Sequence, residues 1–163
     1  MTIDDLRALA VHESGHAVIS QRLGLVVIAT EIDGLDGFTF ILDYDRARPN
    51  VQLAQLMAGR AAEREILGVE MVMRPHVGSD QERIADVLAL IDRRLWPSVL
   101  AQARQASARA VKLHRGTIVQ VANALLERCA VAGEPRARLD GDALAEVLGG
   151  PAVAILRAAA RPI

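Results

Sequence analysis

Apolar residues recur every three or four positions along the first 23 residues of the chain, which is the spacing of one face of an α-helix. Gly24 follows the last of these apolar positions and is a typical helix-ending residue. The pattern therefore predicts a first helix that ends near Gly24, with Thr2 or Asp4 as its N-cap. The apolar positions that define it are Leu6, Leu9, Ala10, Ala17, Val18 and Leu23.

The pattern changes after this helix to two short runs of β-branched and aromatic residues that are separated by glycines. These runs predict two strands, 26–32 and 38–42, with a turn at 33–37. Because a two-stranded hairpin is not stable alone in water, we expect it to lie against the first helix. An edge strand in that place could bind an extended peptide through main-chain hydrogen bonds.

Helical spacing returns in the rest of the chain and predicts four further helical segments. They are 51–68, 79–97, 97–132 with a break near Gly116, and 140–148. The expected caps are Asn50, Ser79 and Asp140. The pattern as a whole predicts a mainly α fold with a small β-hairpin after the first helix. We expect a single domain over residues 1–163, with 151–163 as a loosely docked helix or tail.

Composition and charge narrow the class of protein. Hydrophobic residues make up 52% of the chain and aromatic residues only 2%, which favours helices packed through small and aliphatic side chains. The formal net charge of -1 gives no electrostatic reason to expect a nucleic acid as partner. The single cysteine, Cys129, fits a reducing compartment. Since the chain shows neither a signal peptide nor an 18-residue apolar run, we expect a cytoplasmic protein without a membrane span.

The stretch His12-Glu13-Ser14-Gly15-His16 has the form of a zinc site on the first helix. Residues i and i+4 lie on one face of a helix, so both imidazoles can bind the same ion. Zinc accepts imidazole nitrogen and, in catalytic sites, uses three protein ligands and a water molecule. Glu13 is then a candidate general base for that water. Gly15 indicates either tight helix packing or the close passage of a backbone or a substrate.

The third metal ligand is left open by the local pattern. Asp80, His76, Asp86 and Glu63 are the candidates. Asp80 follows the predicted cap Ser79, where a carboxylate can also simply stabilise the positive end of the helix dipole. Glu63 is a candidate hydrogen-bond acceptor for the outer nitrogen of a ligating histidine, or a solvated charge on a helix face.

Three blocks of sequence occur in a recognisable order: 12–18 (HESGHAV), 58–63 (AGRAAE) and 78–85 (GSDQERIA). In order and approximate spacing they resemble the peptidase domain of FtsH-type ATP-dependent zinc metalloproteases. Residues 113–127 also look like the helical tail of that domain, so the resemblance covers roughly residues 6–148.

The resemblance implies a mainly helical fold with a small β element and a Zn²⁺ cofactor. It further implies His12, His16 and Asp80 as ligands and Glu13 as general base, and so favours Asp80 over His76. The expected function is that of a zinc metalloendopeptidase that hydrolyses peptide bonds in unfolded proteins or peptides.

Two features depart from that family. The chain lacks a phosphate-binding glycine loop, and Ala58 stands where the family usually has glycine. We therefore expect a stand-alone form without the ATPase module. The resemblance leaves a monomer, a homo-oligomer (dimer or hexamer) or a separate ATPase partner as the alternatives for its assembly. Alternative functions are a non-catalytic or regulatory binding module that keeps the fold and the zinc site, or a zinc hydrolase for another amide.

Overall fold

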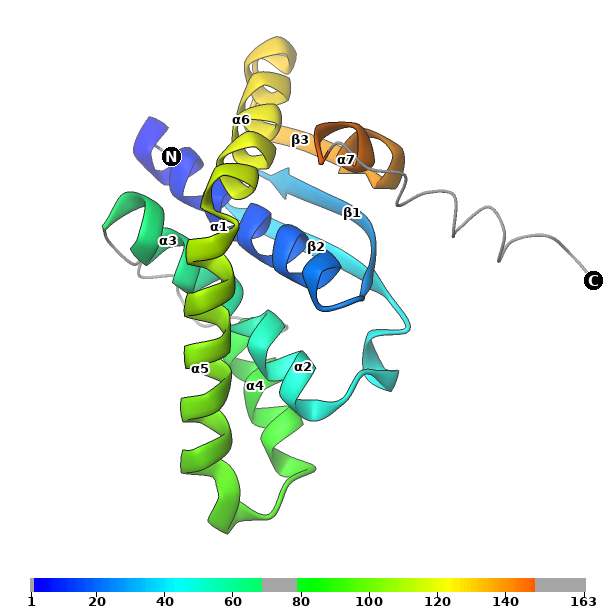
Figure 1. The fold of residues 1–163 in the computed structure, drawn as a ribbon. Helices are drawn as coiled ribbons and strands as arrows, with labels where there is room; N and C mark the ends of the chain where they lie inside the picture. The colour runs from blue at the N-terminus through cyan, green and yellow to red at the C-terminus, as the bar shows by residue number, and fades with distance from the viewer. Residues whose placement is uncertain (1, 69–78, 149–163) are drawn as a thin grey trace, which may run out of the picture.

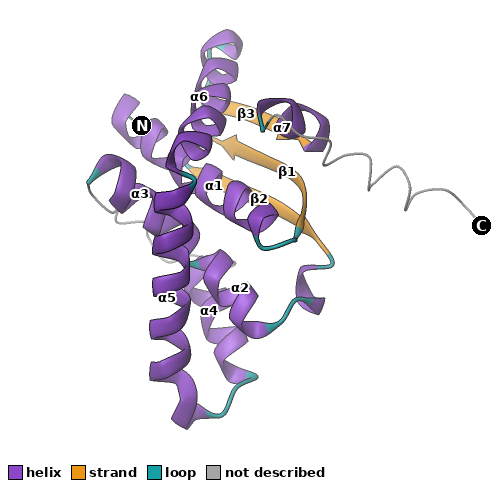
Figure 2. Cartoon of the chain, in the orientation of Figure 1, coloured by secondary structure: helices purple, strands orange, loops and turns teal. Residues whose placement is uncertain are grey.

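The computed structural model describes residues 2–68 and 79–148, and it confirms a mainly α fold with a small sheet after the first helix (Figures 1 and 2). The elements in chain order are α1 (Ile3–Arg22), β1 (Val26–Asp33), β2 (Asp36–Leu42), a 3-10 turn η1 (Tyr44–Arg46), α2 (Pro49–Leu56), α3 (Ala58–Leu67), α4 (Asp80–Ala89), a second 3-10 turn η2 (Arg93–Leu95), α5 (Trp96–Leu113), α6 (Arg115–Ala132), β3 (Arg136–Asp140) and α7 (Gly141–Val147).

Helix α1 is the central element of the fold. Thr2 caps it through a reciprocal capping box with Asp5, which satisfies backbone donors of its first turn. Every residue from 8 to 20 is buried, because α1 packs against α3, α6 and the first two strands. From residue 8 to residue 20 the helix therefore has no solvent-facing side, and any polar group there must find its partners inside the protein.

The sheet has three antiparallel strands in the order β2-β1-β3. The predicted hairpin is present, with Asp33 opposite Asp36 at its turn and Gly34 in the left-handed conformation (φ 67°). The third strand, β3, was not predicted from the sequence. Residues 136–140 (RARLD) do alternate between charged and apolar residues, and the structure shows that Ala137 and Leu139 of this short run are buried between exposed charged residues.

The helix boundaries differ from the predicted ones in three places. The predicted helix 51–68 is divided at Met57 into α2 and α3, and Arg48 rather than Asn50 is the N-cap of α2. Helix α4 ends at Ala89, well before the predicted residue 97. The long helical stretch breaks at His114, two residues before Gly116. Each break allows the following helix to change direction and pack on a different neighbour.

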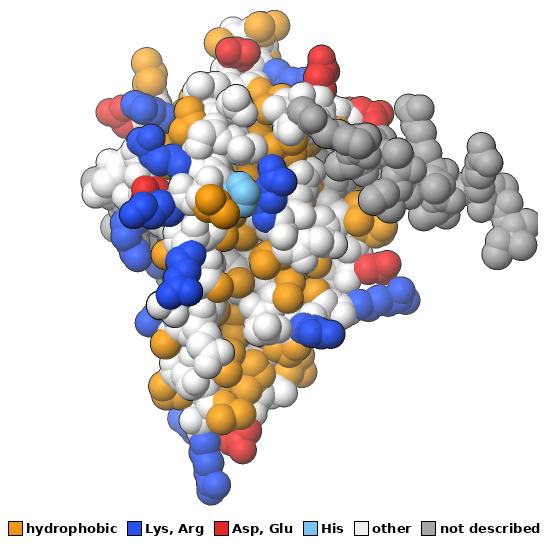
Figure 3. Space-filling view, viewed as in Figure 1, with side chains coloured by type: hydrophobic (Ala, Val, Ile, Leu, Met, Phe, Trp, Pro, Cys, Tyr) orange, Lys and Arg blue, Asp and Glu red, His pale blue; other side chains and the backbone are white. Residues whose placement is uncertain are grey.

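The apolar interior forms two clusters. The larger one lies among α1, α6, the sheet and α7, and includes Leu9, Ile19, Ile118 and Leu125. The smaller one joins α2, α4 and α5. Figure 3 shows hydrophobic side chains also gathering on the surface over the part of the molecule where these three helices lie. Within the described residues, no helix combines the length and the apolar character needed to cross a membrane.

Candidate metal centre

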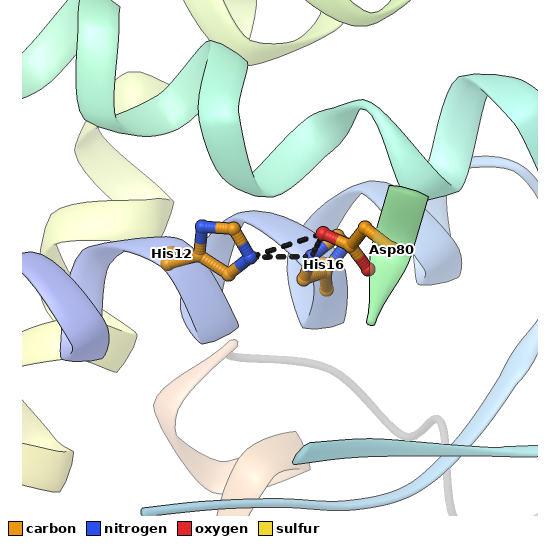
Figure 4. Close-up of side chains that lie close together, drawn as sticks. All are labelled: His12, His16 and Asp80. Atoms are coloured by element: carbon orange, nitrogen blue, oxygen red, sulfur yellow. Dashed lines mark hydrogen bonds and ion pairs between the residues drawn. The ribbon is translucent and has the colours of Figure 1, made fainter. Parts of the chain in front are cut away.

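Three side chains that the sequence predicts as metal ligands meet beside α1 (Figure 4). His12 Nε2 and His16 Nε2 lie 3.0 Å apart. Asp80 Oδ2 lies 3.1 Å from the first nitrogen and 3.0 Å from the second. The two imidazoles are one helical turn apart on α1, and the carboxylate comes from the first residue of α4, which Ser79 caps. These three residues could hold a metal ion.

The donor set and the space around it fit a metal ion. Two imidazoles and one carboxylate form a common donor set for divalent transition metals, and an ion about 2.0–2.1 Å from each atom is compatible with a triangle of this size. Gly59 of α3 provides the room. A Cβ atom added there would lie 2.5 Å from His12 Nε2 and 2.6 Å from His16 Nε2, in the space that an ion bound to them needs. Gly59 was not predicted as a site residue from the sequence.

The outer nitrogen of each imidazole has its own hydrogen-bond acceptor. His12 Nδ1 donates to Glu63 Oε1 over 2.5 Å, and Glu63 is fully buried. His16 Nδ1 donates to the backbone carbonyl of Gln55 over 2.9 Å. When both Nδ1 atoms carry the proton, both Nε2 atoms can present lone pairs to a metal ion. The Gln55 contact could not be predicted from the sequence, because every residue has a backbone carbonyl and the residue type does not show which one will accept the bond.

The charges of this cluster stabilise one another. Burial by itself would lower the pKa of His12, but hydrogen bonds with Asp80 and Glu63 outweigh it and raise that pKa to about 10. For His16, burial is likewise outweighed, chiefly by the charge of Asp80, and the pKa rises. Burial would raise the pKa of Asp80, but the charge of His16 and the hydrogen bonds from both imidazoles hold it well below its usual range. A metal ion binding here would therefore replace protons on the imidazoles.

Glu13 lies next to the cluster and contacts strand β2. Its carboxylate accepts a hydrogen bond from Thr39 Oγ1, 3.0 Å from Glu13 Oε2. The backbone of Gly37 is so close that a Cβ atom there would lie 2.5 Å from Glu13 Cγ. Glu13 is 4% exposed, and this burial raises the pKa of its carboxyl against the opposing charges of His16 and His12. Gly37 and Thr39 were not predicted as site residues, since the sequence pattern indicated only a turn and a strand.

The other candidates from the sequence have different places. Asp86 is exposed and lies outside the cluster of three ligand residues, and Glu63 contacts His12 rather than the metal position. His76 lies outside the described residues. Gly15 allows α1 and α3 to approach closely, since a Cβ atom there would lie 2.8 Å from the carbonyl oxygen of Ala58. Of the two interpretations of Gly15, the structure thus shows the close helix packing.

A cavity of about 670 Å³ adjoins the site between β2 and α4. It shares Thr39 with the Glu13 contact, and Arg83, one turn after Asp80, lies in its wall. Its lining combines apolar and charged side chains: Thr39, Phe40, Ile41, Tyr44, Asp45, Gln52, Arg83, Asp86, Val87 and Leu90. A molecule that reached the metal position along β2 would thus have space for a side chain beside it.

Fold and site together define a mainly helical protein in which two buried histidines and one half-buried aspartate could hold a metal ion. No protein-family model matches this sequence, and no curated protein matches it either.

Proposed function

We propose that this protein is a zinc-dependent endopeptidase that hydrolyses peptide bonds in unfolded proteins or peptides, similar in its chemistry to the peptidase domain of FtsH-type proteases. One observation carries the proposal: three ligand atoms lie 3.0–3.1 Å from one another, with a glutamate one residue from the first ligand. The acceptors on both outer ring nitrogens support it, because they are typical of histidines that bind zinc.

The residues divide the chemistry as follows. His12, His16 and Asp80 would hold the ion. When bound, zinc supplies a polarised substrate carbonyl and a water molecule whose pKa is lowered to about 7. Glu13 takes the proton of that water and returns it to the leaving amine. Since burial raises the pKa of Glu13, its carboxylate is a stronger base than an exposed one.

The position of β2 supports an extended polypeptide as the substrate. Strand β2 is at an edge of the sheet, and it carries Gly37 and Thr39, which contact Glu13. An extended chain can pair with such an edge through its main chain, which places a peptide bond next to the site without regard to sequence. The cavity between β2 and α4 would then receive one of the flanking side chains.

Metal content and peptide cleavage, measured together, test the proposal. We expect about one zinc ion per chain, cleavage of casein or of a peptide library, and loss of cleavage with a chelator. Glu13→Gln should keep the zinc and lose the cleavage, because it removes only the base. A purified protein without zinc affinity would exclude the proposal.

The burial of Glu13 favours a second function, that of a non-catalytic or regulatory module which keeps the metal site. In such a module, water and substrate would not need to reach the carboxylate. The two functions differ in one result: the module binds zinc and peptides but cleaves neither casein nor the library at any zinc concentration.

A further inference from the structure

Two threonines connect the sheet to the carboxylate of Glu13. Thr39 Oγ1 lies 3.0 Å from Glu13 Oε2 and 3.2 Å from the Glu13 carbonyl oxygen. Thr30 of β1 is the direct cross-strand neighbour of Thr39, and the two Oγ1 atoms lie 3.2 Å apart. Thr30 is fully buried, so its hydroxyl has no access to water.

The hydroxyl proton of Thr39 has two acceptors on Glu13 within hydrogen-bond distance, Oε2 at 3.0 Å and the carbonyl oxygen at 3.2 Å. A hydroxyl has one proton to donate, and an ionised carboxylate can only accept. When the Glu13 carboxylate is ionised, Thr39 donates to the nearer acceptor, Oε2, and its own oxygen can then accept the proton of Thr30. In the part of the chain that the structure describes, Thr39 is also the only side chain with a hydrogen bond to the Glu13 carboxylate.

The backbone of β2 restricts the same side chain from a second direction. At Gly37 it comes so near that an added Cβ atom would lie 2.6 Å from Glu13 Oε1 and 2.8 Å from Cδ. The carboxylate is thus held by a hydrogen bond on Oε2 and by a steric contact near Oε1. Neither contact involves a metal ligand.

We propose that Thr39 is a positioning residue for Glu13, and that Thr30 acts through Thr39 by fixing the direction of its hydroxyl. The proposal rests on the function proposed above, in which Glu13 takes a proton from water. A general base must lie within hydrogen-bond distance of that proton, and a misplacement of about 1 Å can reduce the rate about 100-fold. A threonine pair in a sheet is a rigid means of preventing such a misplacement.

Steady-state hydrolysis of a peptide by the zinc-loaded variants tests the role of Thr39. Thr39→Val keeps the shape of the side chain and removes the hydroxyl. We expect it to lower kcat about 10-fold to 100-fold, while KM and zinc content stay at the wild-type values. Thr39→Ser, which restores the hydroxyl, should recover most of kcat. Wild-type kcat in Thr39→Val, or equal loss in the serine variant, would overturn the proposal.

Two further variants separate positioning from a general effect on the sheet. Thr30→Val leaves the Thr39 hydroxyl in place, so kcat should fall, but by less than in Thr39→Val. Thr117→Val makes the same change on α6 and should leave kcat unchanged. A loss of kcat in Thr117→Val as large as that in Thr39→Val would show that the effect is not specific and would overturn the proposal.

A crystal structure of zinc-loaded Thr39→Val decides the positioning role without any activity measurement. We expect the Glu13 carboxylate to be displaced or to occupy more than one conformer, with His12, His16 and Asp80 unmoved. An unmoved Glu13 would overturn the proposal. If the wild type cleaves no peptide, the proposed function fails, yet this structure still decides whether Thr39 holds Glu13. If Thr39→Val does not fold, Thr39→Ala takes its place in the hydrolysis measurement and in the crystal structure.

Discussion

The outer ring nitrogen of His12 donates a 2.5 Å hydrogen bond to Glu63, a residue 51 positions further along the chain. The carboxylate is fully buried on α3 and contacts the ring on the side opposite the metal position. It therefore sets both the orientation of the ring and the nitrogen that carries the proton. This contact joins α1 to α3 at His12, the first of the three residues that could hold a metal ion.

We expect Glu63→Gln to lower zinc affinity about 10-fold to 100-fold, because a neutral acceptor holds the imidazole less well and makes it a weaker ligand. Competition with a chelator of known affinity measures this change. Glu65→Gln removes an exposed charge from the same helix and should bind zinc as the wild type does. Equal affinities in the two variants would show that Glu63 does not support the ligand.

Asp80→Ala should lower zinc affinity sharply, since it removes one of the three atoms that surround the metal position. His76→Ala should leave the affinity nearly intact, and Asp86→Ala, on the exposed side of α4, should do the same. Metal analysis after dialysis measures all three. The reverse result, loss in His76→Ala and retention in Asp80→Ala, would mean that the third ligand is not Asp80.

Gly59→Ala should abolish zinc binding without unfolding the protein. The added methyl group would lie about 2.5 Å from both ligating nitrogens, in the space of the ion. Because the methyl group must also displace the two buried imidazoles in the metal-free protein, we expect the thermal midpoint to fall through an overpacking cost of about 1–3 kcal/mol, offset in part by the roughly 1 kcal/mol by which alanine favours a helix over glycine. Gly116→Ala on α6 is the matched control, since a Cβ atom there meets nothing within 4 Å. Full zinc content in Gly59→Ala would contradict the position inferred for the metal.

Gly37→Ala, unlike Gly59→Ala, should keep the zinc and lose the peptide hydrolysis. The added Cβ atom would lie 2.5–2.8 Å from Cγ, Oε1 and Cδ of Glu13 and would therefore displace that side chain. It would leave the ligand atoms of the metal site untouched. We expect zinc content to stay at the wild-type level while peptide hydrolysis falls about 100-fold, the cost of a misplaced base. Loss of zinc in this variant would show that β2 supports the metal site itself.

The stability of the metal-free protein should fall as the pH rises above neutrality. The pKa of His12 is raised from 6.5 to about 10 in the folded protein, so its protonated form stabilises the fold fully below pH 6.5. That contribution is lost progressively between pH 6.5 and pH 10. Urea unfolding of chelator-treated protein at several pH values in this range measures the loss. Zinc-loaded protein should lose less, because the imidazole then binds the ion in place of the proton.

The helix caps and the β-hairpin could be predicted from the sequence, because they depend on residues within one helical turn or one strand of each other. Thr2, Ser79 and Asp140 cap helices through side chains that accept from backbone groups three residues ahead. The hairpin follows from two β-rich runs and a glycine turn. The breaks at Met57 and His114 could not be placed as well, because their positions depend on the packing of the following helices.

The sequence by itself determined the pair His12 and His16 and the glutamate between them, since a spacing of four residues on a helix brings two side chains to one face. The local pattern left the third ligand open and the resemblance favoured Asp80, but only the tertiary structure shows which distant residues meet the pair. Asp80 reaches the pair from 64 residues beyond His16, and β3 pairs with β1 from about 100 residues further along the chain. Thr39 and Gly37 came to hold Glu13 through the packing of the sheet on α1. Such contacts depend on how whole elements pack, and no local spacing encodes them.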